Sequence, residues 1–208
     1  MISLKLITPI SEIKDKIHES LSIQMNKILQ SNQSFITKEL QGSINGWILE
    51  QPEIISLLSS NPNSLAGQFG IPSGMVNAAV ESIIYSIKNS IRVHFQPFDK
   101  KLKGSFNINV QPDDFKDILS LGTGHVNYKD GDLHWLDWLI TLGSSIIVAN
   151  YHYQPSGGRG RSGLGFMSVG KSFRVSPSFS GTIDDNFITR ALRGRESYIS
   201  SILQKVFS

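Results

Sequence analysis

The sequence predicts an α+β fold with a helical N-terminal part, a small, mostly antiparallel sheet carrying a long flexible loop, and a C-terminal helix packed on that sheet. Two observations predict this class. Apolar residues recur every three or four positions through most of residues 1–94, as on one face of a helix. Alternating or β-branched segments, typical of strands, occur only after that point. We therefore expect a helical region at residues 1–94 and an α+β domain at residues 95–208.

The helical region is expected to contain four helices. The first has Ser11 as N-cap and ends at a break over residues 31–34, and the second follows it. Pro52 is expected to begin a short third helix, and residues 65–71 to form a loop. A long fourth helix is predicted over residues 76–91. The apolar face of the first helix consists of Ile10, Ile13, Ile17, Leu21, Met25 and Ile28.

The second half of the sequence is expected to form short helices and strands joined by loops. A glycine-rich segment, Pro155–Gly165, has five glycines and is expected to be mobile. Thr182–Asp185 should cap a final helix with a weak point at Gly194. The other expected elements are a strand at 106–110, a short helix starting at 112–114, a loop at 122–124, a helix at 133–142, a buried strand at 145–151 and a hairpin of 166–169 with 173–175.

Composition excludes several classes of protein. The 208 residues include no cysteine, which excludes disulfide frameworks, cysteine-based zinc sites and thiol catalysis. No apolar stretch reaches the roughly 20 residues of a spanning helix, and the N-terminus lacks the pattern of a signal peptide. We expect a soluble protein made inside the cell.

Basic residues concentrate near the C-terminus. Residues 159–208 contain eight Lys and Arg against three Asp and Glu, while the whole chain has a net charge of +3. This asymmetry favours a head-to-tail contact between unlike faces, or a face turned toward nucleic acid. The alternative is a solvated helix face. The candidate interface residues are Arg159, Arg161, Arg190 and Arg193.

No segment carries a recognisable catalytic or phosphate-binding motif. His125 and His134 flank Asp130 and Asp132, and imidazole with carboxylate suits a metal ion. Their spacing matches no named motif, and polar loop residues beside a helix start, with Asp132 as N-cap, are the favoured explanation. We therefore predict no catalytic residue, no metal site and no cofactor.

Several segments of the second half occur in a familiar order. They are WLDWLITLG (135–143), IIVANYHY (146–153), RSGLGFM (161–167), FRVSPSFSGT (173–182) and DNFITRALRGRESYISSILQKVF (185–207). This order resembles tailed-bacteriophage neck and tail-completion proteins, which cap the tail tube or join it to the portal. The resemblance covers residues 95–208 and implies a small curved sheet with a long flexible loop and a C-terminal helix. In that family a phenylalanine precedes the helix, and Phe187 occupies this place here.

The resemblance implies a structural virion protein that is not an enzyme. It would be a ring subunit at the neck or tail terminus, joining the head or portal to the tail. Its partners would be copies of itself, in a six-fold or twelve-fold ring, and other virion proteins, with DNA passing through the lumen. The protein would be assembled in the cytoplasm of the host bacterium and located in the virion, away from membranes.

Three alternatives stay open. One is a baseplate or other tail structural protein. Another is an accessory protein that binds nucleic acid through the basic C-terminal part. The last is a hydrolase that uses Asp130, Asp132, His125 or His134.

Overall fold

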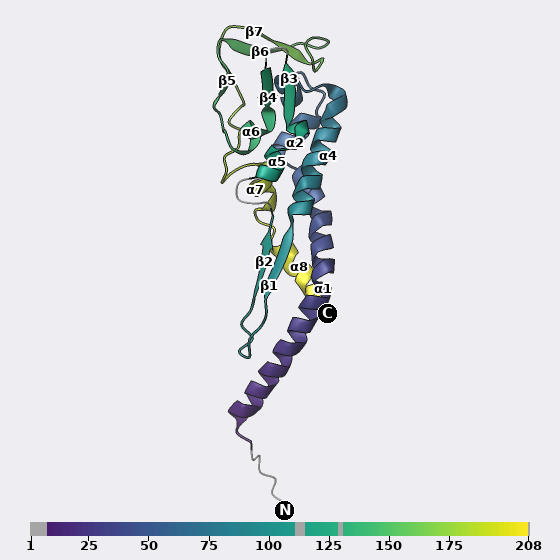
Figure 1. Cartoon of the computed structure of the whole chain (residues 1–208), viewed down its shortest axis with the longest axis vertical. Coiled ribbons are helices and arrows are strands. Elements are labelled where there is room, and N and C mark those ends of the chain that lie inside the picture. The colour runs from purple at the N-terminus through teal and green to yellow at the C-terminus, as the bar shows by residue number, and fades with distance from the viewer. Residues whose placement is uncertain (1–7, 111–114, 129–130, 208) are drawn as a thin grey trace, which may run out of the picture. The chain divides into compact units, whose positions relative to one another are not determined.

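The computed structural model describes residues 8–110, 115–128 and 131–207 (Figure 1). It confirms the α+β class, with a long N-terminal helix, several antiparallel two-stranded ribbons and a C-terminal helix. Within the described residues, no helix has both the length and the apolar character needed to cross a bilayer.

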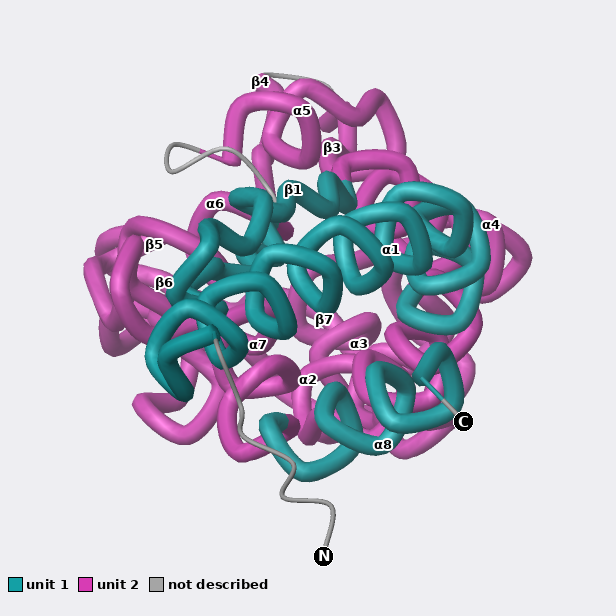
Figure 2. The backbone as a smooth tube through the Cα atoms, turned by 90° about the horizontal axis from the view of Figure 1, so that it is seen from below, with its two compact units in different colours: residues 1–40, 91–109, 196–208 teal, residues 41–90, 110–195 magenta. Residues whose placement is uncertain are grey.

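The chain forms two compact units (Figure 2). Unit 1 consists of Met1–Leu40, Ile91–Asn109 and Glu196–Ser208, and unit 2 of Gln41–Ser90 and Val110–Arg195. Both units combine segments from the two halves of the chain. The division after residue 94 stays a prediction.

Unit 1 is built on the first part of helix α1 (Ile10–Leu49). Strands β1 (Arg92–Gln96) and β2 (Ser105–Asn109) pair antiparallel, with Arg92 opposite Asn109. The strand expected near residues 106–110 is thereby confirmed. Helix α8 (Glu196–Phe207) packs against α1 (Figure 1). The apolar core of this unit includes Leu29, Ile36, Leu40, Val93 and Ile202.

Side-chain amides of α1 hold the β1–β2 hairpin. The Asn26 amide donates to the Phe98 carbonyl at 3.0 Å, and its oxygen accepts from the Phe98 backbone N–H at 2.8 Å. Gln33 Nε2 donates to the Val93 carbonyl at 2.8 Å. These bonds give partners to backbone groups that pairing within the hairpin leaves unsatisfied.

Helix α1 is continuous, so the expected break at residues 31–34 is wrong. Ser31 Oγ and Asn32 Nδ2 donate to the Ile28 carbonyl at 3.0 and 2.9 Å, so these polar side chains bond to the helix without interrupting it. Neither Gly nor Pro occurs there, and burial of Ile36 and Leu40 favours continuation. Ser11 is not the N-cap, because the helix already begins at Ile10.

Unit 2 contains most of the short helices. Helix α2 (Pro52–Leu58) begins at Pro52 as expected, and α4 (Ser73–Ser90) is the expected long apolar helix. Residues 65–71 were expected to be a loop, but α3 (Leu65–Phe69) occupies most of them, capped by Ser64, whose Oγ accepts from the Gly67 N–H at 3.2 Å. The remaining short helices are α5 (Lys116–Leu119), the 3₁₀ turn η1 (Gly122–Gly124), α6 (Trp135–Ile140) and α7 (Phe187–Leu192).

The core of unit 2 joins these helices. The Phe69 and Trp135 rings lie 5.8 Å apart between centroids, and both side chains are fully buried. Trp135 therefore anchors the core of this unit. The helix expected from residues 112–114 is described only as α5, since 111–114 lie outside the described residues.

The strands of unit 2 form separate ribbons. Strand β3 (His125–Tyr128) pairs with β4 (Gly131–His134), and β6 (Tyr151–Pro155) pairs with β7 (Gly165–Val169). Strand β5 (Ile146–Val148) pairs with β8 (Phe173–Arg174). The predicted hairpin of 166–169 with 173–175 is therefore wrong, because each arm pairs with an earlier strand.

The predicted buried strand over 145–151 is also wrong. Its backbone turns at Asn150, with φ of 61°, which separates β5 from β6. Asn tolerates this left-handed conformation better than most residues. Ile146 is 50% exposed, so the β-branched residues of this segment indicate strand propensity and not burial.

The C-terminal helix is divided, at the point where Gly194 was expected to weaken it. Gly194 has φ of 75°, so α7 ends before it and α8 begins after it. Asn186, not Thr182, caps α7, and its side chain accepts from Ile188 N and Thr189 N. The expectation that the C-terminal helix packs on the sheet is corrected, because α8 lies against α1.

Candidate functional site

The two loop arginines are seated on aromatic rings of unit 2. Arg161 lies 4.7 Å from the centroid of the Tyr128 ring and donates a hydrogen bond to the Asn127 carbonyl. Arg159 lies 5.7 Å from the Phe166 ring centroid. Cation–π contact orients both guanidinium groups, and the hydrogen bond further fixes that of Arg161, yet both residues keep exposed surface.

Glycines shape the loop that carries these arginines. The Ser156 N–H donates to the Leu164 carbonyl at 2.9 Å, and the Gly158 N–H to the Gly163 carbonyl at 2.7 Å. Gly160 has φ of 72°, and a Cβ there would lie 1.8 Å from the Gly165 carbonyl oxygen. Glycine at 160 is thus required by the turn itself. The mobility expected for this loop stays a prediction.

Arg190 pairs with a buried carboxylate. Its guanidinium contacts Glu53 of α2, whose side chain is 0% exposed, and lies 3.2 Å from Asp185 Oδ2. Burial raises the pKa of the Glu53 carboxyl, although Arg190 opposes that shift. The structure therefore gives Arg190 two partners within its own unit, and its predicted interface role stays a prediction.

Arg193 keeps the most exposed guanidinium side chain of this cluster. It lies 3.3 Å from Asp185 Oδ1 and is 68% exposed. The neighbouring Arg195 instead lies 3.1 Å from Glu50 Oε2 and 5.1 Å from the Trp47 ring centroid. Among the four predicted arginines, Arg193 combines high exposure with a single, surface ion pair.

Sequence reasoning missed Glu53. Its position in the otherwise apolar segment EIISLL was an available signal, because an acid on a buried helix face needs a partner. That partner could not be identified from the sequence, since Arg190 lies 137 positions away.

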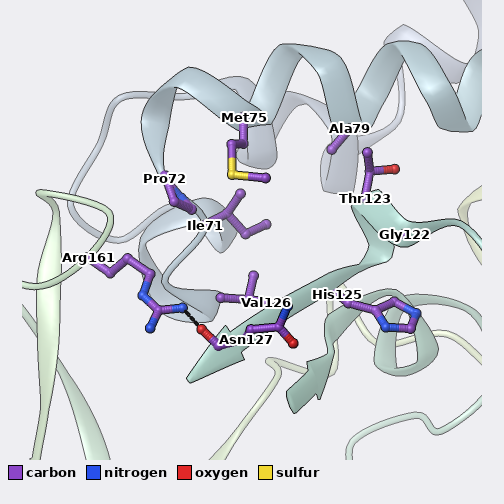
Figure 3. A pocket seen from close by; sticks show the side chains of 10 residues that line it. All are labelled: Ile71, Pro72, Met75, Ala79, Gly122, Thr123, His125, Val126, Asn127 and Arg161. Atoms are coloured by element: carbon purple, nitrogen blue, oxygen red, sulfur yellow. Dashed lines mark hydrogen bonds between the residues drawn. The ribbon is translucent and has the colours of Figure 1, made fainter. Parts of the chain in front are cut away.

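A cavity of about 250 Å³ lies between α4 and the η1–β3 segment of unit 2 (Figure 3). Figure 3 shows Ile71, Met75 and Val126 around it, with Arg161 on one side and His125 on the other. Apolar side chains line one part of it, and Thr123, Asn127 and the two groups just named supply the polar part of the lining.

Two of the predicted histidines come together with one predicted aspartate. His125, Asp132 and His134 each place a ligand-type atom within 4.8 Å of the others. Asp130 lies outside the described residues. Nearby on α6, Asp137 has a pKa raised by burial, which the two histidines partly oppose.

An apolar face of α1 in unit 1 is exposed. Ile10, Ile17 and Leu21 are 66%, 51% and 45% exposed. At about 100° per residue, these three lie on the opposite side of α1 from Asn26 and Gln33, which hold the hairpin. Of the six apolar residues predicted for this face, Ile13, Met25 and Ile28 are half-buried, and the other three are exposed.

Comparisons with known proteins gave no match. No family model matches the chain, and neither the curated proteins nor the solved structures contain a matching protein.

Proposed function

We propose that this chain is a non-catalytic structural subunit of a tailed-bacteriophage virion, which associates with copies of itself as a ring at the neck or tail terminus. The ring, six-fold or twelve-fold, joins the head or portal to the tail and surrounds the path of the DNA. The subunit is made in the cytoplasm of the host bacterium and ends in the virion.

The observation that carries the proposal is the exposed apolar face of α1. Three large aliphatic side chains, Ile10, Ile17 and Leu21, are each more than 40% exposed along one helix face. Removing such surface from water is the main driving force of protein association. A repeated apolar stripe on a long helix is the form of surface that helix-to-helix association uses.

The low charge of that face favours a second copy of this chain over a strongly charged partner as its occupant. Residues 10–28 contain three lysines and three acidic residues, and at about 100° per residue the acidic ones lie on the side opposite the apolar face, which itself carries little charge. A strongly acidic or basic partner would be better matched by a face of one sign. In a ring, this face would meet a different face of the neighbouring copy, because ring contacts are head-to-tail.

The nucleic-acid alternative has less support. Part of the basic charge near the C-terminus is matched within unit 2, where Arg190 meets Glu53 and Asp185, and Arg195 meets Glu50. Each such pair leaves less positive charge for phosphate groups, whose neutralisation dominates DNA binding.

The test compares two isoleucines of the same helix. Ile17→Asp places a charge on the proposed face, whereas Ile23→Asp places it on an equally accessible residue, 60% exposed, on another side. We expect the wild-type chain and Ile23→Asp to form oligomers in sedimentation velocity and native mass spectrometry. Ile17→Asp should need at least ten-fold higher concentration for the same assembly.

Two results would contradict the proposal. One is a wild-type chain that stays monomeric at high concentration, with neck and tail proteins also present. The other is equal assembly of Ile17→Asp and wild type. Association weakened equally by both variants would assign the effect to α1 in general and remove the Ile10–Leu21 face from the interface.

A further inference from the structure

The β3–β4 hairpin places two imidazoles and a carboxylate on one face. His125 and His134 are directly opposite each other in the antiparallel register. Asp132 precedes His134 by two residues, and alternate residues of a strand point to the same side. The three side chains therefore meet because of the strand pairing, although 125 and 134 are nine positions apart in sequence.

The distances among these groups suit a shared cation. Asp132 Oδ2 lies 3.1 Å from His125 Nδ1 and 3.1 Å from His134 Nε2. Ligands at 2.0–2.1 Å from a tetrahedral ion stand roughly 3.3 Å from one another. The two nitrogens lie within 4.8 Å of each other, so a movement of at most about 1.5 Å would place all three atoms around one ion.

Both imidazole rings face the same carboxylate. The rings lie 3.7 Å apart between centroids. One carboxylate oxygen is the common neighbour of both rings.

We propose that His125, Asp132 and His134 bind one divalent transition-metal ion, with Zn²⁺ the best-matched ion. This site is separate from the proposed association face and does not depend on it. Imidazole nitrogens favour Zn²⁺ and its neighbours in the transition series, whereas Mg²⁺ and Ca²⁺ prefer sets of oxygen ligands. Three protein ligands leave a fourth position for water or for a group from another molecule.

The site is accessible to an ion from solvent. The side chains of His134 and Asp132 are 48% and 36% exposed, while His125 is 24% exposed. The ion would join β3 to β4 through side chains, in addition to the backbone pairing of a short ribbon. We therefore expect binding to stabilise the folded chain, because the separated strands of the unfolded state cannot present the same three ligands.

Isothermal titration of the metal-free full chain with ZnCl₂ at pH 7.5 tests the proposal. We expect one ion per chain, at least ten-fold weaker binding for Asp132→Asn and His134→Ala, and unchanged binding for His94→Ala. His94 is an exposed histidine of β1 and serves as the matched control. MgCl₂ in the same experiment should give no binding.

A spectroscopic measurement keeps the proposal testable if one variant fails to fold. Co²⁺ added to the wild-type chain should give the visible absorption of a four-coordinate ion, and Asp132→Asn should lose it. Absence of Zn²⁺ binding by the wild-type chain would overturn the proposal. Equal binding by Asp132→Asn, His134→Ala and His94→Ala would overturn it as well, since the ion would then be held elsewhere.

Discussion

The carboxyl group of Glu53 is buried in unit 2, and the Arg190 guanidinium is the partner that stabilises its charged form. Its Oε2 atom has no hydrogen-bond partner among the described residues, while its other oxygen accepts from Arg190. Desolvation raises the Glu53 pKa above the ordinary 4.5. A raised carboxyl pKa means that its contribution to stability is fully present below pH 4.5 and is lost as the pH rises through the folded-state pKa.

We expect Arg190→Ala to destabilise the chain by about 3 kcal/mol at pH 7, because it leaves a buried carboxylate without its counter-charge. The loss should shrink as the pH falls through the raised pKa of Glu53, since the protonated carboxyl needs no counter-charge. Urea unfolding of wild type and variant at several pH values measures this difference.

The matched control for Arg190→Ala is Arg193→Ala, which removes only a surface pair with Asp185. It should cost less than about 1 kcal/mol at every pH. A loss for Arg190→Ala that stays constant between pH 4 and pH 8 would show that Glu53 is not the group responsible.

Helices and strands were predicted from the sequence where the residues that determine them are close together along the chain. The α4 helix and the Pro52 start of α2 were predicted, because their apolar spacing and helix-start residues lie within the segment itself. Strand partners were not, because β8 pairs with β5 and not with its neighbour β7. The three residues His125, Asp132 and His134 were identified, but only the β3–β4 register shows that they meet.

The β6–β7 ribbon provides an element-scale prediction. We expect Gly160→Ala to destabilise the chain by at least about 2 kcal/mol, since alanine is strained in the left-handed conformation and its Cβ would overlap the Gly165 carbonyl oxygen. Gly157→Ala is the control, because its Cβ would meet open space and its φ is not positive.

Thermal unfolding and amide hydrogen exchange check this pair of variants. Exchange at the Gly158 and Gly165 amides, which donate to Gly163 and Arg159 carbonyls, should accelerate in Gly160→Ala alone. Similar melting temperatures and exchange rates for both variants would mean that the turn does not depend on glycine at 160.

At the scale of the whole molecule, the proposals concern association surfaces and a metal site that draw on different residues. The apolar face of α1 belongs to unit 1, whereas the arginines and the His125–Asp132–His134 cluster belong to unit 2. The association test and the metal test therefore change different residues, and each can be carried out without altering the other site.

Charge reversal at Arg193 tests whether the basic surface takes part in assembly. The Asp185 carboxylate also lies 3.2 Å from Arg190, so Arg193 is not needed to neutralise it, and Arg193→Glu should cost less than about 1 kcal/mol in stability. If Arg193 meets an acidic group of a neighbouring subunit, the variant should assemble at least ten-fold less well, because like charges across an interface repel. Lys171→Glu, the same charge change at another exposed basic residue, should assemble normally.

Sedimentation velocity measures assembly, and circular dichroism checks the fold. A normal spectrum with normal assembly would remove Arg193 from the interface, and lost helicity would instead make it a structural residue of the α7–α8 connection.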